Sequence, residues 1–148
     1  MVYGINGIFA VQVLAINVTG NQIIDFSSTC LNICGYFGLS IAANGELTAD
    51  VVISITNTSS SSAVSINITG NRLALQKAGG KTIQIGNTET ATTARDIIIQ
   101  GNTIIGVAAT TDTYGVLFTG SRPVTNVTIS GNIFSYIIYG NFLAEMWT

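Results

Sequence analysis

The stretch that decides the fold is Ile66-Asn-Ile-Thr-Gly-Asn71, because its pattern recurs along the chain. Close copies are Ile16-Asn-Val-Thr-Gly-Asn21, Ile97-Ile-Ile-Gln-Gly-Asn102 and Val127-Thr-Ile-Ser-Gly-Asn132, and a weaker copy is Leu39-Ser-Ile-Ala-Ala-Asn44. The asparagines that end these copies are 23, 27, 31 and 30 residues apart. Such a period predicts a chain of similar units stacked on one another.

Each unit carries the pattern of a β-strand. Apolar residues alternate with polar ones, as in Ile66 and Ile68, and valine, isoleucine and threonine dominate. No window has apolar residues at helical spacing. A second mark supports the repeat, since Tyr-Gly pairs begin at Tyr3, Tyr114 and Tyr139, and the first two each precede a repeat asparagine by 18 residues. The sequence therefore predicts an all-β fold in which short strands stack in parallel.

Composition excludes several classes of function. The 148 residues are 47% hydrophobic and 8% charged, with a net charge of −2 and no histidine. A nucleic-acid partner is not expected, because phosphate binding needs clustered basic residues. The lack of histidine removes Ser-His and Cys-His catalysis and most zinc sites, and no acidic cluster suggests calcium, so neither metal nor cofactor is expected. No apolar run is long enough to cross a membrane.

The asparagine that ends each repeat has a structural interpretation. At a tight bend between strands, backbone groups turn away from the sheet and need other partners. A column of stacked asparagine amides supplies those partners, and the preceding glycine permits the backbone angles of the bend. We therefore expect a structural column formed by Asn21, Asn44, Asn71, Asn102 and Asn132.

With this repeat, the sequence resembles the right-handed parallel β-helix of the pectate-lyase-like superfamily over nearly its whole length. Its charge-poor, Ser/Thr/Asn-rich style is similar to that of bacteriophage tailspikes and capsule depolymerases. The resemblance implies a right-handed β-helix of about five coils, a homotrimer in the virion, and bacterial surface polysaccharide as the partner. It leaves open whether the parent protein is a hydrolase or a lyase.

Two other interpretations stay open on the sequence. The chain also fits a fragment of a secreted, pectinase-like polysaccharide hydrolase or lyase, or a purely structural trimeric stalk or adhesin module. In each case residues 1–148 form a single β-helix domain. Because the sequence begins and ends within a repeat and lacks a clear capping helix, we expect this domain to be a piece of a longer protein.

The outward positions of the repeat strands form a candidate carbohydrate-binding face. If the repeat isoleucines point inward, the residues between them point outward and carry amides and hydroxyls. These groups suit the donors and acceptors of a sugar chain, although a trimer contact explains them equally well and a solvated face is the favoured interpretation. The candidate binding residues are Asn67, Asp96, Asn126 and Thr128.

The sequence offers only weak candidates for catalysis. Glycoside hydrolysis uses two carboxylates, and Asp25 and Asp50 follow their repeat asparagines at similar offsets in adjacent units. Two strands of adjacent units would place these carboxylates about 8 Å apart, a separation typical of an inverting pair. Cys30 and Cys34 are close enough for a small disulfide or a soft-metal site, but two small packed side chains are the favoured interpretation.

Overall fold

The computed structural model describes residues 6–57, 64–87, 94–108, 112–120 and 124–143. This part of the chain is built from β-strands, and in it we find no helix suited to crossing a membrane. The strands are β1 (Asn6–Thr19), β2 (Gln22–Ala42), β3 (Glu46–Asn57), β4 (Val64–Thr69), β5 (Arg72–Leu75), β6 (Lys81–Asn87), β7 (Ala94–Gln100), β8 (Thr103–Ile105), β9 (Tyr114–Gly120), β10 (Val124–Ser130), β11 (Ile133–Ser135) and β12 (Tyr139–Leu143).

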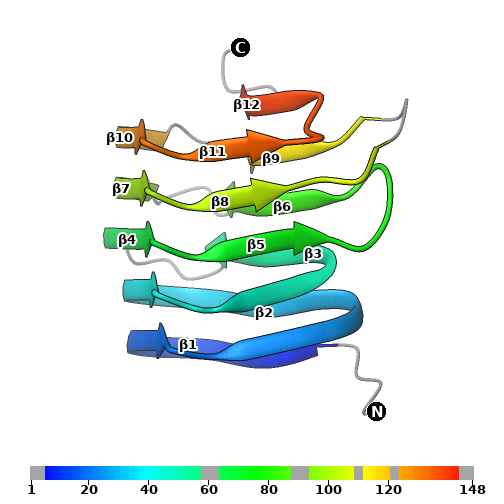
Figure 1. Ribbon diagram of the computed structural model, residues 1–148. Coiled ribbons are helices and arrows are strands. Elements are labelled where there is room, and N and C mark those ends of the chain that lie inside the picture. The colour runs from blue at the N-terminus through cyan, green and yellow to red at the C-terminus, as the bar shows by residue number, and fades with distance from the viewer. Residues whose placement is uncertain (1–5, 58–63, 88–93, 109–111, 121–123, 144–148) are drawn as a thin grey trace.

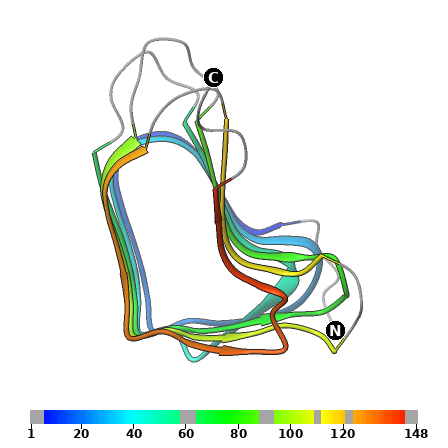
Figure 2. The same ribbon diagram turned by 90° about the horizontal axis from the view of Figure 1, so that it is seen from above.

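All pairings among these strands are parallel, and they arrange the sheet in stacked layers (Figure 1). Seen from above, the chain visits three faces in turn and then returns to the first (Figure 2), where each new strand pairs with the strand of the previous layer. We name the faces by their shorter strands: the β4–β7–β10 face, the β5–β8–β11 face and the β6–β9–β12 face. The long strands β1, β2 and β3 bend around corners and contribute to more than one face. The prediction of an all-β chain of parallel strands is confirmed, and the arrangement is consistent with a parallel solenoid.

The core follows from the alternation of the repeat. Inward residues of the β4–β7–β10 face stack in columns, so that Leu39, Ile66 and Ile97 are paired neighbours and all are buried. Val127 occupies the same column in β10 but is 38% exposed, because β10 ends the pairing order. Ile41, Ile68 and Ile99 form a second buried column of the same kind, and each fully buried isoleucine contributes about 1.5–3 kcal/mol relative to an exposed one.

One corner of each layer is turned by a residue with a left-handed backbone. Gly20, Gly70, Gly101 and Gly131 have φ between 62° and 69°, a range that glycine adopts without strain. In the second layer the equivalent residue is Ala43, with a φ of 52°. The N–H of Ala43 donates to the Thr69 carbonyl just as that of Gly70 donates to the Gln100 carbonyl. The weaker repeat copy therefore makes the same corner as the others.

The spacing of the repeat varies because of what lies between the faces. In the second layer, β2 runs without a break from the β6–β9–β12 face at Cys34 to the β4–β7–β10 face at Leu39. In the next layer, the equivalent residues Thr56 and Ile66 belong to separate strands and are further apart in the sequence. At these positions the strands therefore stay paired in register while the connection between them changes in length.

Candidate functional site

The five repeat asparagines form a continuous hydrogen-bonded ladder beside the left-handed corner. The backbone N–H and the Nδ2 of Asn44 both donate to Oδ1 of Asn71, at 3.1 and 2.7 Å, and Nδ2 also donates to the Val18 carbonyl at 3.1 Å. Asn71 donates to Asn102 in the same way, and Asn102 to Asn132. Asn44, Asn71 and Asn102 are at most 2% exposed. The ladder satisfies its own polar groups within the chain, so these side chains hold the corner together.

A second polar column runs along the outside of the β4–β7–β10 face. Its members, in stacking order, are Asn17, Ser40, Asn67, Ile98 and Thr128. Asn17, Ile98 and Thr128 are exposed, whereas Ser40 and Asn67 are half-buried. Of the predicted binding residues, Asn67 and Thr128 thus share one column, but Ile98 separates them.

The other two predicted binding residues lie together where strands β7 and β10 enter this face. Nδ2 of Asn126 donates to Oδ1 of Asp96 at 2.9 Å, and both side chains are exposed. Ser65, Asp96 and Asn126 hold equivalent positions and have left-handed backbones, with φ of 64°, 58° and 55°. Asparagine and aspartate tolerate this conformation better than most residues, which accounts for their presence at the last two positions.

A hollow of about 400 Å³ lies over the first three layers of this face. Two neighbouring columns form it, one of small residues and one of polar residues with the repeat's apolar positions between them. Ala15, Gly38 and Ser65 make the small column, and the remaining lining residues are Ile16, Leu39, Asn17, Ser40 and Asn67. The small column ends where Asp96 follows Ser65 in the next layer, and the hollow does not extend past that point.

Asn67 is the residue of the hollow whose hydrogen bonding is incomplete. Its Oδ1 is buried and accepts no hydrogen bond, in contrast to Oδ1 of the ladder asparagines. A buried acceptor without a donor costs about 1–3 kcal/mol. Because the terminal torsion of asparagine is soft, the amide can turn toward a ligand that supplies the missing donor.

The sequence predicted Asn67 as a binding residue but missed the hollow. The sequence does contain a feature that could have indicated the hollow. A small residue precedes each of the first three repeat copies, namely Ala15, Gly38 and Ser65. Ala15 and Gly38 are paired neighbours, and Ser65 lines the same hollow one layer further on. Small outward residues in adjacent layers leave space that the larger side chains of later layers fill.

The structure describes the surroundings of one member of the predicted carboxylate pair, Asp50. Oδ2 of Asp50 lies 2.6 Å from Nζ of Lys77, so this carboxylate already has a cationic partner. The side chain of Asp25 lies outside the described part, and the register between β2 and β3 shifts around this residue, between Ile23 and Phe26. The idealised strand spacing used to predict their separation therefore does not apply there.

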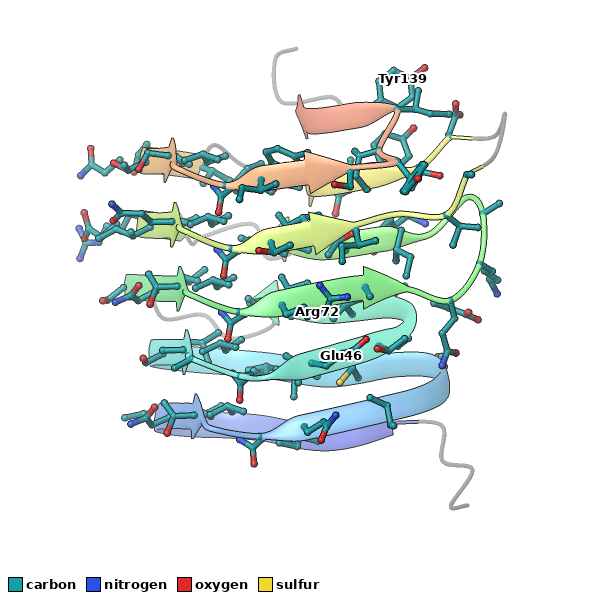
Figure 3. All side chains as sticks on the ribbon, in the orientation of Figure 1. Glu46, Arg72 and Tyr139 are labelled. Carbon is teal, nitrogen blue, oxygen red and sulfur yellow. The ribbon has the colours of Figure 1, made fainter. Side chains whose placement is uncertain are left out.

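A second ion pair is formed by Glu46 and Arg72. Glu46 and Arg72 face each other on the β5–β8–β11 face, with Oε2 and Nε 3.8 Å apart (Figure 3). Among the side chains that the structure describes, no group of three or more aspartates, glutamates or cysteines is arranged to hold a metal ion.

Both cysteines are free thiols on β2. Cys30 is fully buried, and burial raises the pKa of its thiol to about 12, although a backbone hydrogen bond with Thr48 opposes the shift. Cys30 is therefore a neutral core side chain near neutral pH, with its thiol 3.7 Å from the Ile23 carbonyl. Cys34 is half-buried, and its thiol lies 3.7 Å from Oδ1 of Asn32.

Two of the three tyrosines that marked the repeat are neighbours in the structure, and Tyr3 lies outside the described residues. Tyr139 pairs with Tyr114 in register, and their rings stack with centroids 5.1 Å apart and an angle of 21° between planes. Tyr139 lies toward the C-terminal end of the stack, on β12 (Figure 3). The pair of stacked tyrosine rings belongs to the β6–β9–β12 face and is separate from the hollow.

Comparison with known proteins gives no further assignment. Neither a scan of protein-family models nor searches of the curated proteins and of the solved structures found a match to this chain.

Proposed function

We propose that this chain is part of a phage tailspike-like or tail-fibre-like protein and that it contacts bacterial surface polysaccharide through the hollow on the β4–β7–β10 face. The fold proposed with it is a right-handed parallel β-helix of about five coils. Its assembly is a homotrimer in the virion. The support for the handedness, the trimer and the location is the resemblance of the repeat to tailspikes.

The observation that carries the binding proposal is the unsatisfied amide of Asn67 at the hollow. Sugar hydroxyls donate and accept hydrogen bonds, so a glycan can supply the donor that Oδ1 of Asn67 lacks. The lining combines amides and hydroxyls with the exposed Ala15 and the half-buried Ile16, and such a mixture suits a ligand with both hydroxyl groups and C–H surfaces. The volume of about 400 Å³ lies in the range of small-ligand sites.

The stacked architecture supports a role as a rigid spike. Parallel strands pair from layer to layer, and the asparagine ladder connects one corner along the stack. A rod that presents one polar face keeps a binding hollow fixed relative to the rest of an assembly. The face retains exposed groups beyond the hollow, such as Ile98 and Thr128, that are available for subunit contact.

Binding of a panel of bacterial polysaccharides to the wild-type chain and two variants tests the proposal. Asn67→Ala removes the amide at the hollow, and we expect the dissociation constant of the bound polysaccharide to rise about tenfold, the loss of one good hydrogen bond. Gln84→Ala is the matched control, because it removes a half-buried amide from the β6–β9–β12 face. Equal losses in both variants, or no binding by the wild type, would overturn the glycan site.

Light scattering tests the assembly separately. We expect three copies of the 15.5 kDa chain in one particle. A monomer at every concentration would overturn the trimeric spike while leaving glycan binding to be judged by the titrations.

A further inference from the structure

The lining of the hollow also indicates which class of glycan it takes, a step that rests on the function proposed above. We infer that the hollow binds an uncharged segment of polysaccharide that lies along the stacking direction of the strands and extends over about three layers.

The first argument is charge. All eight residues that line the hollow are uncharged. The nearest charged residues on the face are Asp96, which follows Ser65 in the small column, and its neighbour Arg95, and neither lines the hollow. Moving the carboxylate of an acidic sugar from water into a site without a cation is costly, whereas neutral hydroxyls find partners among the amides and hydroxyls present.

The second argument is direction and length. Asn17, Ser40 and Asn67 follow one another in three layers that are about 4.8 Å apart, which is close to the length of one sugar ring in an extended chain. A glycan along this column therefore meets one polar side chain per ring. This column of polar side chains ends in the fourth layer, where the side chain of Ile98 is 40% exposed and offers no hydrogen bond.

The test compares neutral polysaccharides (dextran, mannan and galactan) with acidic ones (polygalacturonate and alginate) by titration at about 0.05 and 0.5 M salt. We expect the wild type to prefer a neutral glycan, with a dissociation constant that changes less than about twofold with salt. Oligosaccharides of the preferred glycan should gain affinity up to about three rings and then no further.

A charge placed in the hollow sharpens the test. Ser40→Lys should gain binding to an acidic glycan by about tenfold at low salt and lose that gain at high salt. Ser54→Lys is the control, since it puts the same charge at a half-buried serine of the β6–β9–β12 face.

The outcomes separate the two proposals. Wild-type binding that favours an acidic glycan and weakens with salt would overturn the inference while the glycan site stands. Equal gains in Ser40→Lys and Ser54→Lys would also overturn it, because the charge would not then be acting in the hollow. A wild type that binds no polysaccharide would overturn the function, and with it the inference.

Discussion

Asn71 and Asn67 stand four residues apart in one repeat, yet their amides have opposite surroundings. Oδ1 of Asn71 accepts two hydrogen bonds from Asn44, and its Nδ2 donates to Asn102 and to the Ile41 carbonyl. Oδ1 of Asn67 is buried and accepts none. In the column of repeat asparagines, the neighbouring layers supply hydrogen-bond partners and the amide stabilises the fold. In the column of Asn67 they do not, and the side-chain oxygen remains without a hydrogen-bond donor. The contrast separates an asparagine that is fully hydrogen-bonded within the fold from one whose buried acceptor has no donor.

Removing a ladder amide should have the largest effect on stability. Asn71→Ala leaves the buried backbone N–H of Asn44 without its acceptor, and it removes one donor each from Oδ1 of Asn102 and from the Ile41 carbonyl. At about 1–3 kcal/mol for an unsatisfied buried group, with the lost side-chain bonds added, we expect the free energy of unfolding to fall by about 3 kcal/mol. Denaturant titration followed by circular dichroism measures this value.

The end of the ladder provides the control for that loss. Asn21 is half-buried and donates to Asn44 and to the Thr19 carbonyl, so Asn21→Ala should cost about 1–2 kcal/mol. Equal losses at Asn21 and Asn71, or a loss under about 1 kcal/mol at Asn71, would show that the ladder does not hold the corner.

The amide of the hollow should behave in the opposite way. Asn67→Leu removes an acceptor that has no donor and adds apolar contact beside its outward neighbour Ile98, so we expect the free energy of unfolding to rise by about 1 kcal/mol. The same variant should lose glycan binding. A fall in stability as large as that of Asn71→Ala would mean that Asn67 is a structural residue and that the contrast between the columns is wrong.

The sequence predicted the strands and their inward residues because both follow from local pattern. Alternation places Ile66 and Ile68 in the core whatever surrounds them. The hollow could not be predicted in this way, since it depends on Ala15, Gly38 and Ser65 meeting across three layers. The distance assigned to Asp25 and Asp50 rested on a regular register, and the irregular pairing between β2 and β3 removes that basis.

The smallest expected effect concerns the strain that the ladder imposes on its own corner. Ala43 adopts the left-handed backbone that glycine adopts in the other layers, and the adjacent Asn44 is fully engaged in the ladder. Space is not the constraint, because a Cβ built at Gly20 or Gly101 meets no atom within 4 Å. The backbone conformation of Ala43 therefore destabilises the folded state by about 1–2 kcal/mol. A glycine would remove this strain, but part of the gain would be lost because glycine also makes the unfolded chain more flexible. We expect Ala43→Gly to raise the free energy of unfolding by about 0.5–1 kcal/mol, while Ala42→Gly, at an extended strand position next to it, should lower stability by a similar amount. A loss of stability in Ala43→Gly would show that Ala43 does not keep the left-handed conformation in solution. The hydrogen bonds of Asn44 would then not be strong enough to hold the backbone of Ala43 in that conformation.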